Sequence, residues 1–256
     1  MATSNNTDRK EEESLQCAWK NLQHEELAEL EYAAAQVKKG QKEEPQLSQL
    51  VQKIVKHFQE HSDKRIRQAR NDASPFFAPA SFSTLEKSVL WIAGCRPSSF
   101  IRLIYALSGI EPGSHMTQFL EAIKTGELRE LKGKQLSMID ELQGVTIREE
   151  RRISTRLASL QEDMVDQQFS GKMKKKTDCD KDDECENADE TLDEHSQHMA
   201  GVMEEADKLR MKTLKEIVLT ILDPIQAVEY LAAAKKISFA LFRSSVVVVM
   251  IRIIKD

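Results

Sequence analysis

The sequence predicts an all-α protein, built as a single bundle of long antiparallel helices. Charged residues make up 31% of the 256 residues and aromatic residues only 5%, a composition typical of long solvated helices. Apolar residues recur at helical spacing through several long segments, and Gly, Pro and N-cap residues separate these segments. We therefore divide the chain into a disordered N-terminus (1–13), a helical domain (14–242) and an apolar tail (243–256).

The first two helices are expected over residues 14–39 and 46–70, and a proline-containing loop over 71–82. The apolar positions of the first helix are Leu15, Trp19, Leu22, Leu27 and Leu30. One face of the second helix carries Leu47, Leu50, Val51, Ile54, Val55 and Phe58. Both sets follow the helical period, so each predicts a face that packs in the core.

The segment from 83 to 109 has the clearest helix signals in the sequence. Ser83 and Glu86 form a capping box for a helix that we expect to end at Gly94 in a left-handed turn. Pro97 suits the first position of the next helix, where its missing N–H costs nothing, and Gly109 ends that helix.

The second half of the chain predicts a short helix near 116–124 and two long helices over 134–169 and 193–222. In the first long helix, a seam typical of helix pairing is formed by Ile153, Leu157, Leu160 and Met164. The second is expected to bury Leu209, Leu214, Ile217, Val218 and Ile221. Blocks of opposite charge between the two helices predict a disordered insert over 170–190.

The last helix is expected to begin with Asp223 as N-cap, Pro224 at the first helical position and Gln226 at the third. It should end near Phe242. The β-branched apolar tail that follows fits an edge strand, a buried tail or an aggregation-prone terminus.

The run Trp91-Ile-Ala-Gly-Cys-Arg-Pro-Ser-Ser99, within 85–109, closely resembles the signature of the plant delay-of-germination domain. The same domain forms the C-terminal half of TGA-type bZIP transcription factors. Shorter matches over 117–120, 160–163 and 205–236 extend the resemblance to about 14–242. The chain is more similar to the stand-alone seed dormancy regulators than to the bZIP factors.

The signature residues are Trp91, Gly94, Arg96, Pro97, Ser98 and Ser99. We interpret them mainly as a structural corner, in which the Trp91 indole N–H needs one partner and Arg96 binds helix-end carbonyls or a carboxylate. The alternative is that Arg96 and Ser98 line a ligand or partner site.

The resemblance implies a non-enzymatic regulator of seed dormancy that binds type 2C protein phosphatases in abscisic acid signalling. Relatives use an Asp-Ser-Tyr motif followed by two residues and a Trp. Here Trp19 is retained, but the leading positions are Ser14, Leu15 and Gln16. We hypothesise that Trp19 anchors the partner, flanked by Leu15 and Leu22. The alternative, weighted equally, is that Trp19 packs against the next helix.

The resemblance also implies haem, bound by paired histidines in the final helix. Those positions hold Ser238 and Phe242 here, neither of which ligates iron, so no cofactor is expected there. His57 and His61 lie four residues apart on one helix face, but a third metal ligand is lacking. We expect them to be solvated surface histidines, and a haem or small-ligand carrier that uses them is the weakest hypothesis.

Phosphate-binding loops, nucleophile elbows and zinc-protease motifs are missing from the sequence, so no enzyme is expected. The net charge of −5 and the lack of a basic region with a leucine zipper argue against direct DNA reading. A transcription module that dimerises with related domains or bZIP partners remains the alternative function. No apolar run is long enough to span a membrane, and the four cysteines suit reduced thiols in the nucleus or cytoplasm.

Overall fold

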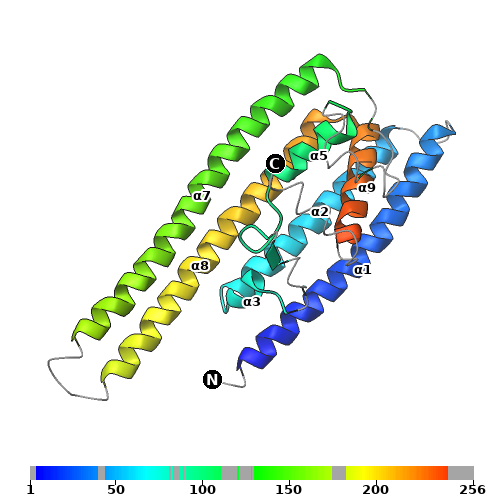
Figure 1. The fold of residues 1–256 in the computed structure, drawn as a ribbon. Coiled ribbons are helices and arrows are strands. Elements are labelled where there is room, and N and C mark those ends of the chain that lie inside the picture. The colour runs from blue at the N-terminus through cyan, green and yellow to red at the C-terminus, as the bar shows by residue number, and fades with distance from the viewer. Residues whose placement is uncertain are drawn as a thin grey trace.

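Two long antiparallel helices, α7 (Gly133–Lys174) and α8 (Asp183–Lys215), lie side by side along one edge of the computed structural model (Figure 1). On its other side α8 contacts α2 (Glu44–Ala69). The final helix, α9 (Pro224–Leu241), packs against both α2 and α1 (Ser4–Lys38). Two shorter helices, α3 (Ser74–Phe77) and α5 (Ser98–Leu107), complete the bundle.

The structure describes residues 4–39, 44–80, 82, 87–88, 90–110, 120, 128, 130–174 and 183–241. For 4–13, 38, 167–174, 183–193 and 240–241 it describes the backbone alone. Within these ranges every regular element is helical, which confirms the all-α class. No helix in the described part of the chain is long and apolar enough to cross a membrane.

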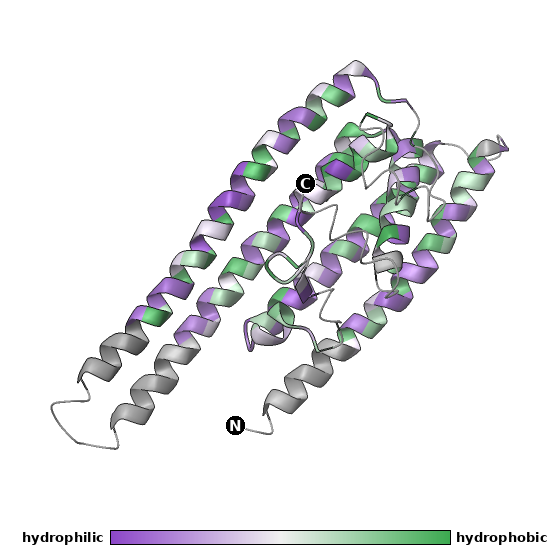
Figure 2. Ribbon diagram, in the orientation of Figure 1, coloured by the Kyte–Doolittle hydropathy of each residue, from purple (hydrophilic) through white to green (hydrophobic). Residues whose placement is uncertain are grey.

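The main core lies where α2, α5 and α9 meet the end of α8. Its largest fully buried members include Leu47, Ile54, Ile101, Ile104 and Leu231. Along α7, Ile153 is fully buried and Leu157 and Leu160 pack beside it, which confirms three of the four residues of the predicted pairing seam. The five residues predicted to be buried in 193–222 are also confirmed as core. The ribbon in Figure 2 alternates between hydrophilic and hydrophobic residues along α7 and α8, as expected of helices with one buried and one solvated side.

Helix ends in the second half of the bundle follow the sequence closely. The Asp223 carboxylate accepts the backbone N–H groups of Ile225 and Gln226, while the Gln226 side chain accepts the N–H of Asp223. This reciprocal pair confirms the predicted cap of α9. Between α8 and α9 the chain makes a π-helical turn, η1 (Glu216–Ile221). At the end of α5, Gly109 adopts a φ of +67°, which confirms its role as helix terminator.

Three expectations on the helices need correction or fall outside the described residues. Helix α1 begins at Ser4, and α7 and α8 reach Lys174 and Asp183, so helix extends into both segments expected to be disordered. Those segments contain charged residues of good helix propensity and no proline, so nothing in them stops a helix that has already begun. The capping box at 83–86 lies outside the described residues, as do most of 116–124, Phe242 and the tail.

The buried face of α1 was predicted wrongly. Leu30 and Ala33 are buried, but the other buried positions are the polar Gln16, Gln23 and Glu26, whereas Leu15, Leu22 and Leu27 are only partly covered. The reason is a partner on another helix. Lys235 of α9 is 2% exposed and donates to Gln23 at 2.6 Å and to Glu26 at 2.5 Å. A buried ammonium needs such partners, and they take the place of leucines.

Candidate functional site

The signature turn, Trp91–Gly94, is the most unusual piece of backbone in the described chain. Trp91 and Gly94 exchange two backbone hydrogen bonds, of 2.8 and 3.2 Å. The two residues between them, Ile92 and Ala93, have φ values of 45° and 59°. Left-handed backbone at such residues costs roughly 1–3 kcal/mol each, and it persists only where the surroundings hold it. The expected left-handed conformation is therefore present, but at Ile92 and Ala93 rather than at Gly94.

Two arginines and one aspartate hold this turn. Arg210 of α8 donates to the carbonyl oxygens of Trp91, Ile92 and Cys95, at 2.5, 2.7 and 2.8 Å. Arg65 of α2 donates to the carbonyl of Ala93 at 2.6 Å. Asp207 lies between the two guanidinium groups and accepts a hydrogen bond from each. The two arginines thus supply hydrogen-bond donors to four backbone carbonyl oxygens of the turn and of the residue that follows it.

Gly94 is required because Arg210 passes directly over it. A Cβ atom added at this position would lie 2.8 Å from Cζ of Arg210, closer than real Cβ contacts. The role of the glycine is therefore close approach rather than a left-handed dihedral angle.

The remaining signature residues tie α5 to α7. The carboxylate of Glu150, 2% exposed, accepts hydrogen bonds from Arg96 Nε at 2.9 Å and from the backbone N–H of Ser98 at 2.6 Å. The indole N–H of Trp91 donates to Ser154 of α7 at 3.0 Å. Pro97 precedes the first helical residue, one position before its expected place. Glu150 is thus the carboxylate expected for Arg96, and Ser154 is the partner expected for the Trp91 indole N–H.

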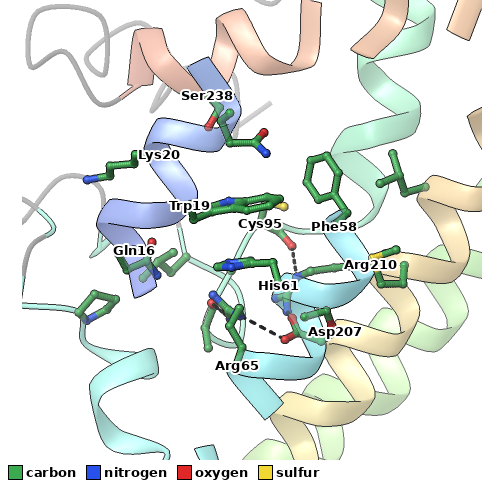
Figure 3. Close-up of a pocket in the computed structure, with 18 of the residues that line it drawn as sticks. Gln16, Trp19, Lys20, Phe58, His61, Arg65, Cys95, Asp207, Arg210 and Ser238 are labelled. Atoms are coloured by element: carbon green, nitrogen blue, oxygen red, sulfur yellow. Dashed lines mark hydrogen bonds and ion pairs between the residues drawn. The ribbon is translucent and has the colours of Figure 1, made fainter. Parts of the chain in front are cut away.

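A cavity of about 300 Å³ opens beside the signature turn, where α1, α2, α8 and α9 converge (Figure 3). We call it the Trp19 cavity. It brings together residues from the three regions that the sequence analysis singled out: the first helix, the signature and the final helix. Its lining includes Gln16, Trp19, Lys20, Phe58, His61, Ser62, Arg65, Cys95, Phe100, Asp207, Arg210 and Ser238.

Trp19 packs against the second helix. Its ring is stacked on His61, with centroids 4.0 Å apart and planes 6° apart, and it meets Phe58 edge-on at 4.9 Å. The side chain is half-buried, so part of the indole still reaches the surface. Leu15 packs beside α3 in a small separate cluster, and Leu22 is partly buried.

His57 and His61 are not solvated surface residues, which corrects the sequence expectation. Nδ1 of His57 lies 2.6 Å from the buried carboxylate of Glu26. Burial, with a smaller effect from the positive charge of Arg65, lowers the pKa of His61 to about 3. The spacing of the two histidines along α2 could not reveal this, because the residues that contact them, Glu26 and Trp19, belong to α1.

The Cys95 side chain has accessible surface, yet burial raises the pKa of its thiol. Both properties are expected of a group that faces an internal cavity instead of bulk water. Cys95 and Cys17 are free thiols.

The lining does not fit the paired-histidine haem site that the resemblance implies. Ser238 lies at the cavity and offers a hydroxyl where an imidazole would be needed, and Phe242 lies outside the described residues. Of the two alternative candidates only His61 faces the cavity, since His57 is bound to Glu26. Among the described residues, no group of three His, Cys, Asp or Glu side chains is placed to hold a metal ion.

Comparison with known proteins gives the same family as the signature. A family model described as seed dormancy control (DOG1) matches residues 26–106, which span α2, the signature turn and α5. Protein DOG1-like 3 of Arabidopsis thaliana is 35% identical over 94% of this chain and 86% of its own length. The chain belongs to the delay-of-germination family. DOG1-like 1 and DOG1-like 2 of the same plant, 34% and 32% identical, each align with 87% of the chain.

Family membership indicates a role related to seed dormancy. Sequence reasoning missed Arg65, Asp207, Arg210 and the buried group of Gln23, Glu26 and Lys235. In the sequence, Arg65 stands in the C-terminal half of the second predicted helix, where a basic residue suits the negative helix end and gives no further signal. Asp207 has no signal in the sequence other than its place in the segment 205–236, which resembles the family. Residues of this kind are recognised from contacts between distant helices, which no local pattern contains.

Proposed function

We propose that this chain is a regulatory binding protein of seed dormancy control, which acts in abscisic acid signalling by binding a type 2C protein phosphatase. The uncovered face of α1 is the observation that carries the proposal. Along α1, seven exposed residues recur at alternating spacings of four and three, so they share one side of the helix. We call this row the α1 face: Ser14, Ala18, Asn21, Glu25, Ala28, Tyr32 and Ala35.

The composition of the α1 face suits a partner better than solvent alone. Three of its members are alanines, which leave room for the backbone of a partner to approach closely. Tyr32 is 63% exposed, and tyrosine is among the residues enriched at the centres of interfaces. The neighbouring face of α1 is fixed on α2 and α9, so the row is presented on a rigid element.

Trp19 acts in this proposal from the edge of the α1 face, together with Leu15 and Leu22. Its stacking on His61 sets the position of α1 relative to α2, and Trp19 directly follows Ala18 of the α1 face in the sequence. Replacing it with alanine is therefore expected to weaken partner binding in two ways, through α1 placement and through lost contact area.

Binding of a purified type 2C phosphatase, measured by pull-down and calorimetry, tests the proposal. Ala28→Arg places a long charged side chain on the α1 face, whereas Ala158→Arg makes the same change at an exposed position of α7. We expect the wild type and Ala158→Arg to bind alike and Ala28→Arg to bind at least tenfold more weakly. Equal binding by all three proteins would rule out the α1 face. Equal binding by Trp19→Ala would remove Trp19 from the account.

A further inference from the structure

We propose that the Trp19 cavity binds a small aromatic molecule that carries one anionic group, such as a carboxylate. This inference does not depend on phosphatase binding, because none of the seven residues of the α1 face lines the cavity and the variants used below leave Trp19 unchanged. It rests on the volume of the cavity, its aromatic walls, the charges that line it, and polar side chains that have no partner.

The volume and walls suit a ring. About 300 Å³ is at the lower end of the range of small-molecule sites, which are mostly apolar with a few placed polar groups. Rings and aliphatic side chains from four helices and the signature segment form most of the wall: Phe58, Leu90, Phe100, Met211, Leu214 and Phe239.

The charges that face the cavity favour an anion. Lys20, Arg65 and Arg210 are cations, and Asp207 is the one carboxylate among the described lining residues. Asp207 is shared between both arginines, so the positive charge of the lining is not neutralised. Arg210 donates to carbonyl groups and to Asp207, and Arg65 donates through Nε and one terminal nitrogen, so a ligand anion would be held by the remaining nitrogen of Arg65 and by neutral donors.

Neutral donors are available and without partners. Gln16 is 7% exposed, and its amide forms no hydrogen bond to any described residue. The same holds, within the described part of the chain, for the imidazole of His61 and the hydroxyl of Ser238. Figure 3 shows Gln16 and His61 on the same side of the Trp19 ring, with Arg65 below them. The Gln16 amide is not among the fully buried unpaired atoms of the described chain, so it keeps access to the cavity and its N–H groups can donate to a ligand anion.

The test uses naphthalene-2-carboxylate as the probe and its neutral amide as the comparison. Binding is followed by calorimetry and by quenching of tryptophan fluorescence. We expect the acid to bind at millimolar concentration or below, and the amide at least fivefold more weakly. His61→Phe retains a ring to stack on Trp19 but removes the nitrogens, and Gln16→Leu removes the amide. Each substitution should weaken binding of the acid about tenfold, which is the effect of losing one hydrogen bond to a charged group.

Two matched variants test whether the probe binds in the Trp19 cavity. Ser238→Phe fills the cavity, whereas Ser159→Phe adds the same ring at an exposed position of α7. Circular dichroism establishes that both variants are folded before binding is measured. Loss of probe binding in Ser238→Phe alone supports the proposal. Failure of the acid to bind the wild type, equal binding of acid and amide, or unchanged binding by Ser238→Phe and Gln16→Leu would each overturn it.

Discussion

Replacing His61 with phenylalanine should make the stability of the protein less sensitive to mild acid. His61 has a pKa of about 3 in the folded chain, mainly because burial disfavours the charged ring, against an ordinary value of 6.5. Between these two values the unfolded chain binds a proton that the folded chain does not. Stability is therefore fully present above about pH 6.5 and is lost as the pH falls toward 3.

The expected size follows from the same two values. For a single proton, each pH unit below the pKa of the unfolded chain lowers the free energy of unfolding by about 1.4 kcal/mol. Because pH 5 lies about 1.5 units below that pKa, lowering the pH from 7.5 to 5 should lower the free energy of unfolding by about 2 kcal/mol. A phenylalanine ring still stacks on Trp19 and cannot take up a proton. The variant should therefore lose little stability over this interval.

Urea unfolding at pH 7.5 and pH 5, followed by circular dichroism, measures the difference directly. His198→Phe, at an exposed position of α8, is the matched control and should retain the acid sensitivity of the wild type. If His61→Phe lost as much stability as the wild type between the two pH values, the buried and neutral state of His61 would be refuted.

Further predictions concern the signature turn, its anchor and nucleic acid. Gly94→Ala should lower the free energy of unfolding by about 2–3 kcal/mol, because the new methyl group displaces Arg210 from the carbonyls that it holds. Gly144→Ala, in the middle of α7 with only an ordinary contact, should instead stabilise by up to about 1 kcal/mol, and equal effects in urea unfolding would contradict the close approach. Glu150→Ala should lower the free energy of unfolding by about 3 kcal/mol, because Ser98 and Arg96 lose their acceptor. Glu162→Ala, at an exposed position of α7, is the control and should change the urea midpoint little. Purified protein alone should give no gel shift with TGA-type DNA sites, and a shift at physiological salt would contradict the expectation that the chain lacks a DNA-reading element.

Local patterns predicted most of the fold. The α9 cap, the Gly109 terminator and three of the four seam residues of α7 depend on residues close together in sequence, and all are present as expected. The family could likewise be named from the signature alone. The ends of α1, α7 and α8 were placed too far inward, since charge blocks without proline were taken to indicate disorder when they also favour helix.

The site was less predictable, because its geometry depends on distant contacts. Neither the left-handed pair Ile92 and Ala93 nor the buried Glu26 follows from local propensity, and both exist because Arg210 and Lys235 come from other helices. For Trp19 the sequence offered two alternatives, a partner anchor and packing against the next helix. The stacking on His61 shows the packing, and the anchor role stays a prediction.

Hydrogen–deuterium exchange of the chain, with and without a purified type 2C phosphatase, tests the central claim most directly. If the α1 face holds the partner, backbone amides over residues 14–35 should gain protection in the complex, while those over 140–160 of α7 should be unchanged. Protection confined to α7 and α8, or no change anywhere at saturating phosphatase, would contradict the account.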